Sequence, residues 1–167
     1  MRQPAPAPPP LDIEKLLDVL DRHDVRYVLI GGVAARLHGS PDLTEDVDIT
    51  PERSRVNLRR LGAALREIHA RLRGAEDVDW PVDERALGNV EVLTLTTDCG
   101  LLDICFRPAG GQSYEQLTAN AQAYDVFGVR IAVASLDDII ASKTAAGRNK
   151  DLRGLATLHA LRERLRR

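Results

Sequence analysis

The residues with the clearest chemical potential are two aspartates, Asp46 and Asp48, which are separated by a single residue. The segment 46–50 (DVDIT) alternates polar and apolar residues, which is the period of a β-strand. Residues two apart on a strand point to the same face, so the two carboxylates lie together while Val47 and Ile49 take the other face. Adjacent carboxylates repel each other unless a cation neutralises them. Because Mg²⁺ prefers oxygen ligands and keeps positions for water and phosphate, we expect a magnesium site at this pair.

Asp103 supplies a third carboxylate. It interrupts the apolar segment 101–106 (LLDICF), where an isolated charge is costly to bury unless it is paired or bound to metal. If this strand lies beside the strand of Asp46 and Asp48, three carboxylates converge on two metal ions about 4 Å apart. One ion would activate an attacking oxygen, and the other would hold a triphosphate and the leaving pyrophosphate.

A pair of glycines, Gly31 and Gly32, lies between a strand-like segment, residues 26–30 (RYVLI), and a short helix-like segment. Backbone amides without side chains can approach phosphate oxygens, and the N-terminus of a helix favours negative charge. A tight turn explains an isolated Gly-Gly equally well, and a solvated strand edge explains an isolated Asp-Val-Asp. The two features in this order, followed by a third carboxylate on a later strand, are much more specific for nucleotide phosphates and metal.

The basic residues are strongly biased, with 20 arginines and only three lysines. Two of these lysines, Lys143 and Lys150, lie close together in one segment. A GC-rich coding sequence explains the bias itself, but a site that needs a compact point charge would retain lysine. A solvated helix end explains both lysines as well, and the end of a helix also explains Arg148 between them. The net charge of −2 means that any binding of a polyanion must depend on such local clusters.

The pattern of apolar residues predicts an α/β or α+β fold with a mixed sheet flanked by helices. Helices are expected over residues 11–24, 33–37, 54–73, 114–120, 135–146 and 151–166. Strands are expected over residues 26–30, 46–50, 90–96, 101–106, 123–127 and 129–134. We expect residues 74–89 to be an irregular loop and residues 1–10, which are rich in Pro and Ala, to be a disordered lead. The domain core is expected over residues 11–134, with a helical segment, residues 135–167, packed on it.

Several classes of protein do not fit this sequence. The 167 residues suffice for one domain, and no apolar run approaches the ~20 residues that span a bilayer. The N-terminus lacks the apolar core of a signal peptide, so Cys99 and Cys105 are expected to be reduced thiols in a cytoplasmic protein. The four histidines lack the spacing of a zinc site, and His38 is expected to have a structural role.

The order of these motifs has a parallel in a known family. Gly31-Gly32, thirteen intervening residues and then Asp46-Val47-Asp48-Ile49 resemble the signature of the DNA polymerase β-like nucleotidyltransferase superfamily. More narrowly, four segments are similar to the AbiEii/MenT nucleotidyltransferase toxins, namely residues 38–41 (HGSP), 44–49 (TEDVDI), 135–143 (SLDDIIASK) and 147–151 (GRNKD). The resemblance covers residues 12 to 160 and implies a minimal polymerase β-like nucleotidyltransferase fold.

The resemblance also implies which residues form the site. The expected metal ligands are Asp46, Asp48 and Asp103. The expected nucleotide-binding residues are Gly31, Gly32, Lys143 and Arg148. Lys143 would contact the phosphates of an NTP substrate, and Asp151 would also be needed at the site. Locally, Asp151 is equally well explained as an acid in the first turn of the last helix.

The toxin branch implies an acceptor, the 3′ end of a tRNA, and a cognate antitoxin as partner. Local basic surface for RNA could come from the arginines in and just before the expected helix or from the C-terminal arginines, although solvated helix faces explain such charges by default. The former are Arg53, Arg55, Arg59 and Arg60, which follow the strand of Asp46 and Asp48, and Arg66, Arg71 and Arg73 further along. Two alternatives keep the enzyme but change the acceptor to a side chain of a partner protein or to a small molecule such as an aminoglycoside. A further alternative is a non-catalytic module that retains the fold.

Overall fold

The computed structural model describes residues 3–4 and 6–167, so part of the expected lead, residues 1, 2 and 5, lies outside the described residues. The helices are α1 (Ile13–Arg22), α2 (Gly31–Leu37), α3 (Arg55–Glu67), α4 (Glu84–Gly88), α5 (Tyr114–Asn120), α6 (Leu136–Ala146) and α7 (Asn149–Leu165). The strands are β1 (Tyr27–Ile30), β2 (Asp46–Pro51), β3 (Arg71–Leu72), β4 (Val92–Thr97), β5 (Gly100–Cys105), β6 (Gln122–Val126) and β7 (Val129–Val133). None of the helices in the described chain is long and apolar enough to span a membrane.

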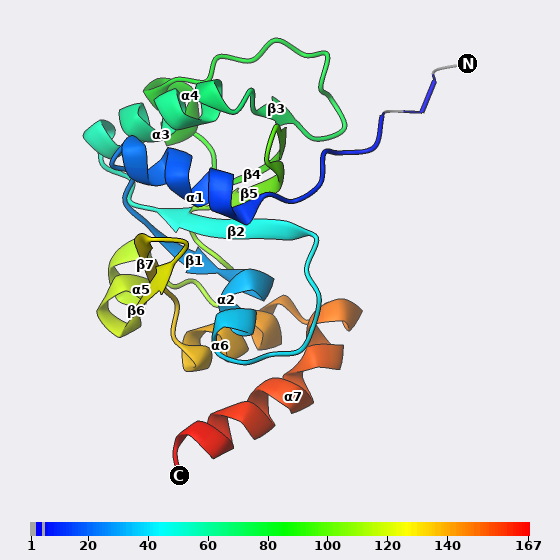
Figure 1. Cartoon of the computed structure of the whole chain (residues 1–167), viewed down its shortest axis with the longest axis vertical. Coiled ribbons are helices and arrows are strands. Elements are labelled where there is room, and N and C mark those ends of the chain that lie inside the picture. The colour runs from blue at the N-terminus through cyan, green and yellow to red at the C-terminus, as the bar shows by residue number, and fades with distance from the viewer. Residues whose placement is uncertain (1–2, 5) are drawn as a thin grey trace.

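All seven strands form one sheet in the order β3-β4-β5-β2-β1-β7-β6. β2 pairs parallel with β5 and β1 pairs parallel with β7, while the other neighbours are antiparallel. Helices cover the sheet on both sides, with α1, α3 and α4 on one side of β2 and α2, α6 and α7 on the other (Figure 1). This arrangement confirms the predicted mixed sheet flanked by helices.

The strand alternation of β2 decides which residues enter the core. Val47 and Ile49 have no exposed surface and belong to the same buried cluster as the apolar stripes of α1 and α3. Those stripes consist of Leu16, Leu17, Leu20, Leu58, Leu61 and Leu65. Each such side chain contributes about 1.5–3 kcal/mol when fully buried. The register of β2 is therefore fixed by its apolar residues, and its two aspartates must face the opposite side.

The structure corrects the expected helix over residues 54–73. α3 ends at Glu67, because His69 takes a left-handed φ of +51° and the amide of Ala70 donates to the carbonyl of Leu65. The apolar period of α3 continues past its end at Glu67, because Ile68 is also buried. The chain then reverses, and the last part of the expected helix becomes β3.

The expected loop over residues 74–89 also contains an element that the pattern did not indicate. α4 is a single short helix whose N-cap, Asp83, accepts a hydrogen bond from the amide of Ala86 at 2.8 Å. Leu87 anchors it with no exposed surface. Five residues are too few for a period to be recognised in the sequence.

The remaining elements agree with the prediction within a few residues. Ser135 caps α6 as expected, accepting a hydrogen bond from the amide of Asp138 at 3.1 Å. Gly147 ends this helix in the left-handed conformation, with φ of +64°. α7 begins at Asn149 rather than Asp151, which places Asp151 in its first turn.

Candidate active site

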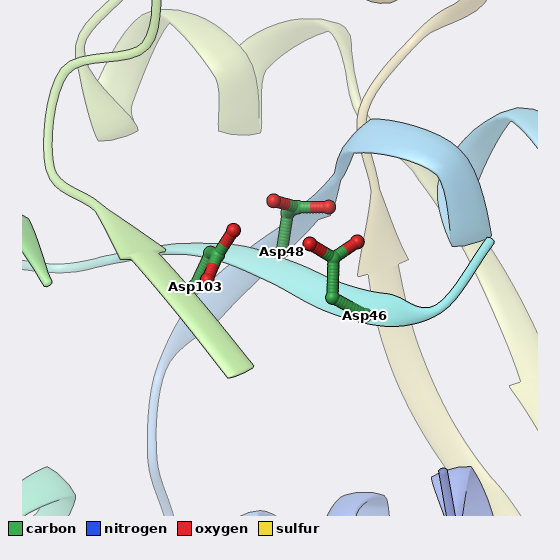
Figure 2. Close-up of side chains that lie close together, drawn as sticks. All are labelled: Asp46, Asp48 and Asp103. Carbon is green, nitrogen blue, oxygen red and sulfur yellow. The ribbon is translucent and has the colours of Figure 1, made fainter. Parts of the chain in front are cut away.

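The three predicted carboxylates come together on one face of the sheet. Asp46 and Asp48 lie two apart on β2, and the parallel register of β2 and β5 sets Asp48 directly opposite Asp103. Each residue offers a carboxylate oxygen within 4.8 Å of the others (Figure 2). Among the described residues, no other group of acidic, histidine or cysteine side chains is arranged to hold a metal ion.

The negative charges of the three aspartates are only partly balanced by neighbouring basic side chains. The pKa of Asp48 is raised to about 7, first by burial and then by the charges of Asp46 and Asp103, while Lys150 and Lys143 act in the opposite direction. Burial and the neighbouring Asp46 also raise the pKa of Asp103, although Arg73 lowers it. A divalent cation at this point would relieve the repulsion, so the donor set fits the magnesium ion that the sequence predicts.

The two glycines allow the backbone to pass close to the carboxylates. Gly31 has φ of +69°, and a Cβ added there would lie 2.8 Å from Cγ of Asp48. A Cβ added at Gly32 would lie 2.8 Å from Oγ1 of Thr44. Thr44 in turn donates to the backbone carbonyl of Asp46 at 3.1 Å and lies 3.3 Å from its Oδ1. Glycine is therefore required here by steric contact with residues of the site, not only by the turn.

Arg73 is a member of the site, although the sequence placed it only among the arginines along an expected helix. Its Nη2 donates to Oδ1 of Asp103 at 2.6 Å and to the carbonyl of Leu95 at 3.1 Å. Both partners of the ion pair are half-buried, with 30% of the Arg73 side chain and 22% of the Asp103 side chain exposed. Because residue 73 was expected at the end of a long helix, only the pairing of β3 with β4 could have placed it here.

The segment that joins α6 to α7 supplies a second set of charges. Asp151 is only 4% exposed, and its carboxylate accepts a hydrogen bond from Nε of Arg148 at 2.7 Å. Burial alone would raise the pKa of Asp151, but this hydrogen bond and the charges of Arg148 and Lys143 outweigh it and lower the pKa. The Arg148 side chain stays 63% exposed, so Asp151 fixes its direction and leaves donors free.

These two sets of residues line one cleft of about 700 Å³, within the usual range for small-molecule and cofactor sites. One wall carries the three aspartates, Gly31 and Gly32, and the other carries Lys143, Arg148, Lys150 and Asp151. The structure thus brings every predicted site residue to the same cleft. Their individual roles stay predictions.

Other predicted features lie elsewhere. His38 is buried, and its ring nitrogens lie 2.8 Å from the carbonyl of Ala134 and 3.3 Å from the hydroxyl of Tyr124, which confirms the structural role. Cys99 and Cys105 are both free thiols, as expected, and Cys105 lines the cleft.

Comparison with known proteins gives no match to a family model or to a curated protein sequence. The structure is similar to that of the lincosamide antibiotic adenylyltransferase LnuA bound to lincomycin, with a TM-score of 0.61 and 16% identity over 92% of this chain and 99% of LnuA. It is similar to ANT(2'')-Ia in complex with adenylyl-2''-tobramycin, with a TM-score of 0.54 and 19% identity over 92% of this chain and 94% of the other. A third similar structure is an antigenic nucleotidyltransferase-like protein from Paracoccidioides brasiliensis, with a TM-score of 0.53 and 21% identity over 89% of this chain and 74% of the other.

The fold is that of the nucleotidyltransferases. This confirms the fold class expected from the Gly-Gly and Asp-x-Asp motifs. The narrower resemblance to the AbiEii/MenT branch has no counterpart among these three structures and stays a prediction.

Within this nucleotidyltransferase fold, the arginines of α3 and of the C-terminus do not line the cleft. Arg55 and Arg59 lie on α3, on the opposite side of β2 from α6 and α7, and both pair with Glu84 at 3.0 and 2.7 Å (Figure 1). At the C-terminus, Arg162 and Arg166 both pair with Asp137, at 3.3 and 3.1 Å. In each group two arginines share one carboxylate at the surface, which agrees with the alternative that they are solvated helix faces.

Proposed function

We propose that this protein is an enzyme that transfers a nucleotidyl group from an NTP to a hydroxyl group of an acceptor. The observation that carries this proposal is the cleft itself, in which an acidic cluster faces a basic corner. Asp46, Asp48 and Asp103 supply oxygen ligands for a cation, and Lys143 and Arg148 supply charge for phosphate groups. An NTP bound with Mg²⁺ needs both at once.

In this proposal Asp46 and Asp48 hold Mg²⁺, which supplies Lewis-acid stabilisation of the phosphate oxygens when it is bound. Thr44 orients Asp46 by its hydrogen bonds, and the absence of side chains at Gly31 and Gly32 lets phosphate oxygens approach the backbone. The basic residues Lys143, Arg148 and Lys150 serve the triphosphate, and Asp151 directs Arg148 within the cleft.

The reaction breaks one bond at the α-phosphorus of the NTP and forms another there. The hydroxyl oxygen of the acceptor forms a bond to the α-phosphorus of the NTP, and the bond from that phosphorus to the oxygen bridging to the β-phosphate breaks. Pyrophosphate leaves with the electron pair, and the hydroxyl proton passes to a base. Asp103 is the candidate base because it lies across the strand pair from Asp48 and lines the same cleft.

For the acceptor, we infer that a small hydroxylated molecule fits better than tRNA. The lining of the cleft also includes Asp42, Glu45 and Asp138, which would repel a polyanion, and the arginines of α3 lie on the other side of the sheet. LnuA, a lincosamide antibiotic adenylyltransferase, is similar in structure over 92% of this chain. The toxin function, with a tRNA 3′ end as acceptor and a cognate antitoxin as partner, is the rival, and it is supported by the sequence resemblance and by the exposed cations Lys150 and Arg153 of the cleft.

The proposal is tested by release of labelled pyrophosphate from each γ-³²P NTP with Mg²⁺, in the presence of aminoglycosides, lincosamides or total tRNA. We expect release that requires one acceptor class and that disappears in Asp46→Asn. Asp125→Asn is the matched control. Asp125 lies on the edge strand β6, and its carboxylate pairs with Arg130 of β7. Release with tRNA alone would replace the small-molecule acceptor by the toxin function. No release with any acceptor, although the NTP binds, would support the non-catalytic module.

A further inference from the structure

Arg73 and the carboxylates occupy one row across the sheet. Leu72 pairs with Leu95 in the antiparallel register of β3 and β4, and the amide of Arg73 donates to the carbonyl of Thr94 at 3.0 Å. Thr94 lies opposite Asp103, and Asp103 lies opposite Asp48. The row therefore places a guanidinium beside the carboxylates by backbone pairing, not by the chance position of a long side chain.

The ion pair of Arg73 with Asp103 is partly buried, so water screens its charges only weakly. Nη2 is 2.6 Å from Oδ1 of Asp103, and the second acceptor of the same nitrogen, the carbonyl of Leu95, restricts its direction. Nε of Arg73 is buried and has no hydrogen-bond partner among the described residues. The contact with Asp103 therefore forms although this nitrogen loses its hydration, which is unfavourable. A pair in this partly buried setting is screened less than a surface pair.

The other cations of the cleft do not form such a contact with the cluster. Lys143 and Lys150 act on Asp48 only through their charge, and Arg148 is committed to Asp151 at 2.7 Å. Arg73 is therefore the one basic side chain among the described residues that forms an ion pair with a carboxylate of the cluster. It offsets one of three negative charges that lie within 4.8 Å of one another.

We propose that Arg73 takes the place of one of the two metal ions that three converging carboxylates would otherwise hold. Before NTP binds, the cluster then accepts a single divalent ion, at Asp46 and Asp48. Arg73 holds the carboxylate of Asp103 away from this ion, so that Asp103 is available to the acceptor. Arg73 is thus a positioning residue that acts through Asp103. This inference rests on the metal role of Asp46 and Asp48 in the proposed function.

The test counts the Mn²⁺ ions that the NTP-free protein binds, by the loss of the electron paramagnetic resonance signal of free Mn²⁺. We expect one ion per chain in the wild type, two in Arg73→Gln and one in Arg73→Lys, which restores the charge. Arg71→Gln, two residues earlier on β3, is the matched control, because Arg71 donates to the carbonyl of Glu76 and not to the cluster. The same ion count in the wild type and in folded Arg73→Gln would overturn the inference.

A second variant keeps the inference testable if Arg73→Gln alone does not fold. The double variant Arg73→Gln with Asp103→Asn removes both charges of the pair and is expected to bind one Mn²⁺ with an affinity within about threefold of the wild type. A loss of binding in the double variant would show that Asp103 is an obligatory ligand and would overturn the inference. No Mn²⁺ binding by the wild type, with or without NTP, would instead contradict the metal role in the proposed function and this inference with it.

Discussion

Asp103 lies directly opposite Asp48 across the parallel pair of β2 and β5, and its other neighbour is the guanidinium of Arg73 at 2.6 Å. One carboxylate of the cluster is thus paired with a cation of the protein, while Asp46 and Asp48 lack such an ion pair in the described structure. This asymmetry separates a side of the site suited to metal from a side suited to the acceptor.

Replacing Asp48 by asparagine should abolish transfer and at the same time stabilise the metal-free protein. The variant loses a proposed metal ligand, for which we expect a loss of at least about 100-fold in kcat/KM. It also removes a buried charge that Asp46 and Asp103 repel, so the melting temperature at pH 8 without metal should rise by a few degrees. Thermal denaturation with EDTA and activity with Mg²⁺ measure the two effects. A fall in metal-free stability would contradict the repulsion.

The stability of the metal-free protein should depend on pH through Asp48. Its pKa is raised from 3.8 to about 7 in the folded state, so the folded protein holds a proton that the unfolded chain releases. The contribution of Asp48 is therefore fully present below pH 3.8, declines as the pH rises toward 7 and is lost above it.

Bound Mg²⁺ should remove most of this dependence, because protons and Mg²⁺ compete for the same carboxylate. We expect Mg²⁺ to raise the melting temperature more at pH 8 than at pH 6. Asp48→Asn serves as the control and should show neither dependence. An equal Mg²⁺ effect at both pH values in the wild type would rule out competition at this residue.

Gly31→Ala should impair the site through a steric contact with Asp48. Gly128 provides a matched control, because it also has a positive φ, of +79°, but nothing lies within 4 Å of an added Cβ. Both alanine variants pay the cost of the left-handed conformation, about 1–2 kcal/mol, and only Gly31→Ala must displace the carboxylate. We expect both to lose stability in urea denaturation and only Gly31→Ala to lose Mn²⁺ affinity. Similar Mn²⁺ affinity in the two variants would contradict this role.

Asp151 should affect NTP binding through Arg148. Asp151→Asn weakens the hydrogen bond that directs the guanidinium, so we expect KM for the NTP to rise about tenfold with a smaller change in kcat. Because Asp151 is buried, the variant should also lose about 1–3 kcal/mol of stability. The double variant with Arg148→Gln should bind NTP no worse than Arg148→Gln alone, since both act through one contact. Additive losses would show that Asp151 acts on the nucleotide by another route.

Cys105 offers a probe of occupancy that does not depend on turnover. It lines the cleft two residues from Asp103, whereas Cys99 has no exposed surface and serves as an internal control. We expect an NTP with Mg²⁺ to slow alkylation of Cys105 by iodoacetamide several-fold, as measured by peptide mass spectrometry, without any effect on Cys99. Alkylation of Cys105 at an unchanged rate would place the nucleotide outside this part of the cleft.

The sequence by itself determined the local part of this site. The two-residue spacing of Asp46 and Asp48 puts both on one face of any strand, and the buried Val47 and Ile49 decide which face that is. The order of the Gly-Gly and Asp-x-Asp motifs was enough to predict the nucleotidyltransferase fold. These features depend on backbone geometry over a few residues, which a sequence pattern records.

Tertiary structure alone decided what faces the cluster. The reversal at His69 turned the end of an expected helix into β3, and strand pairing then brought Arg73 to Asp103 from thirty residues away. The same packing placed Arg55 and Arg59 on the far side of the sheet, paired with Glu84. Register between strands distant in sequence is set by the burial of whole apolar faces, so no local pattern contains it.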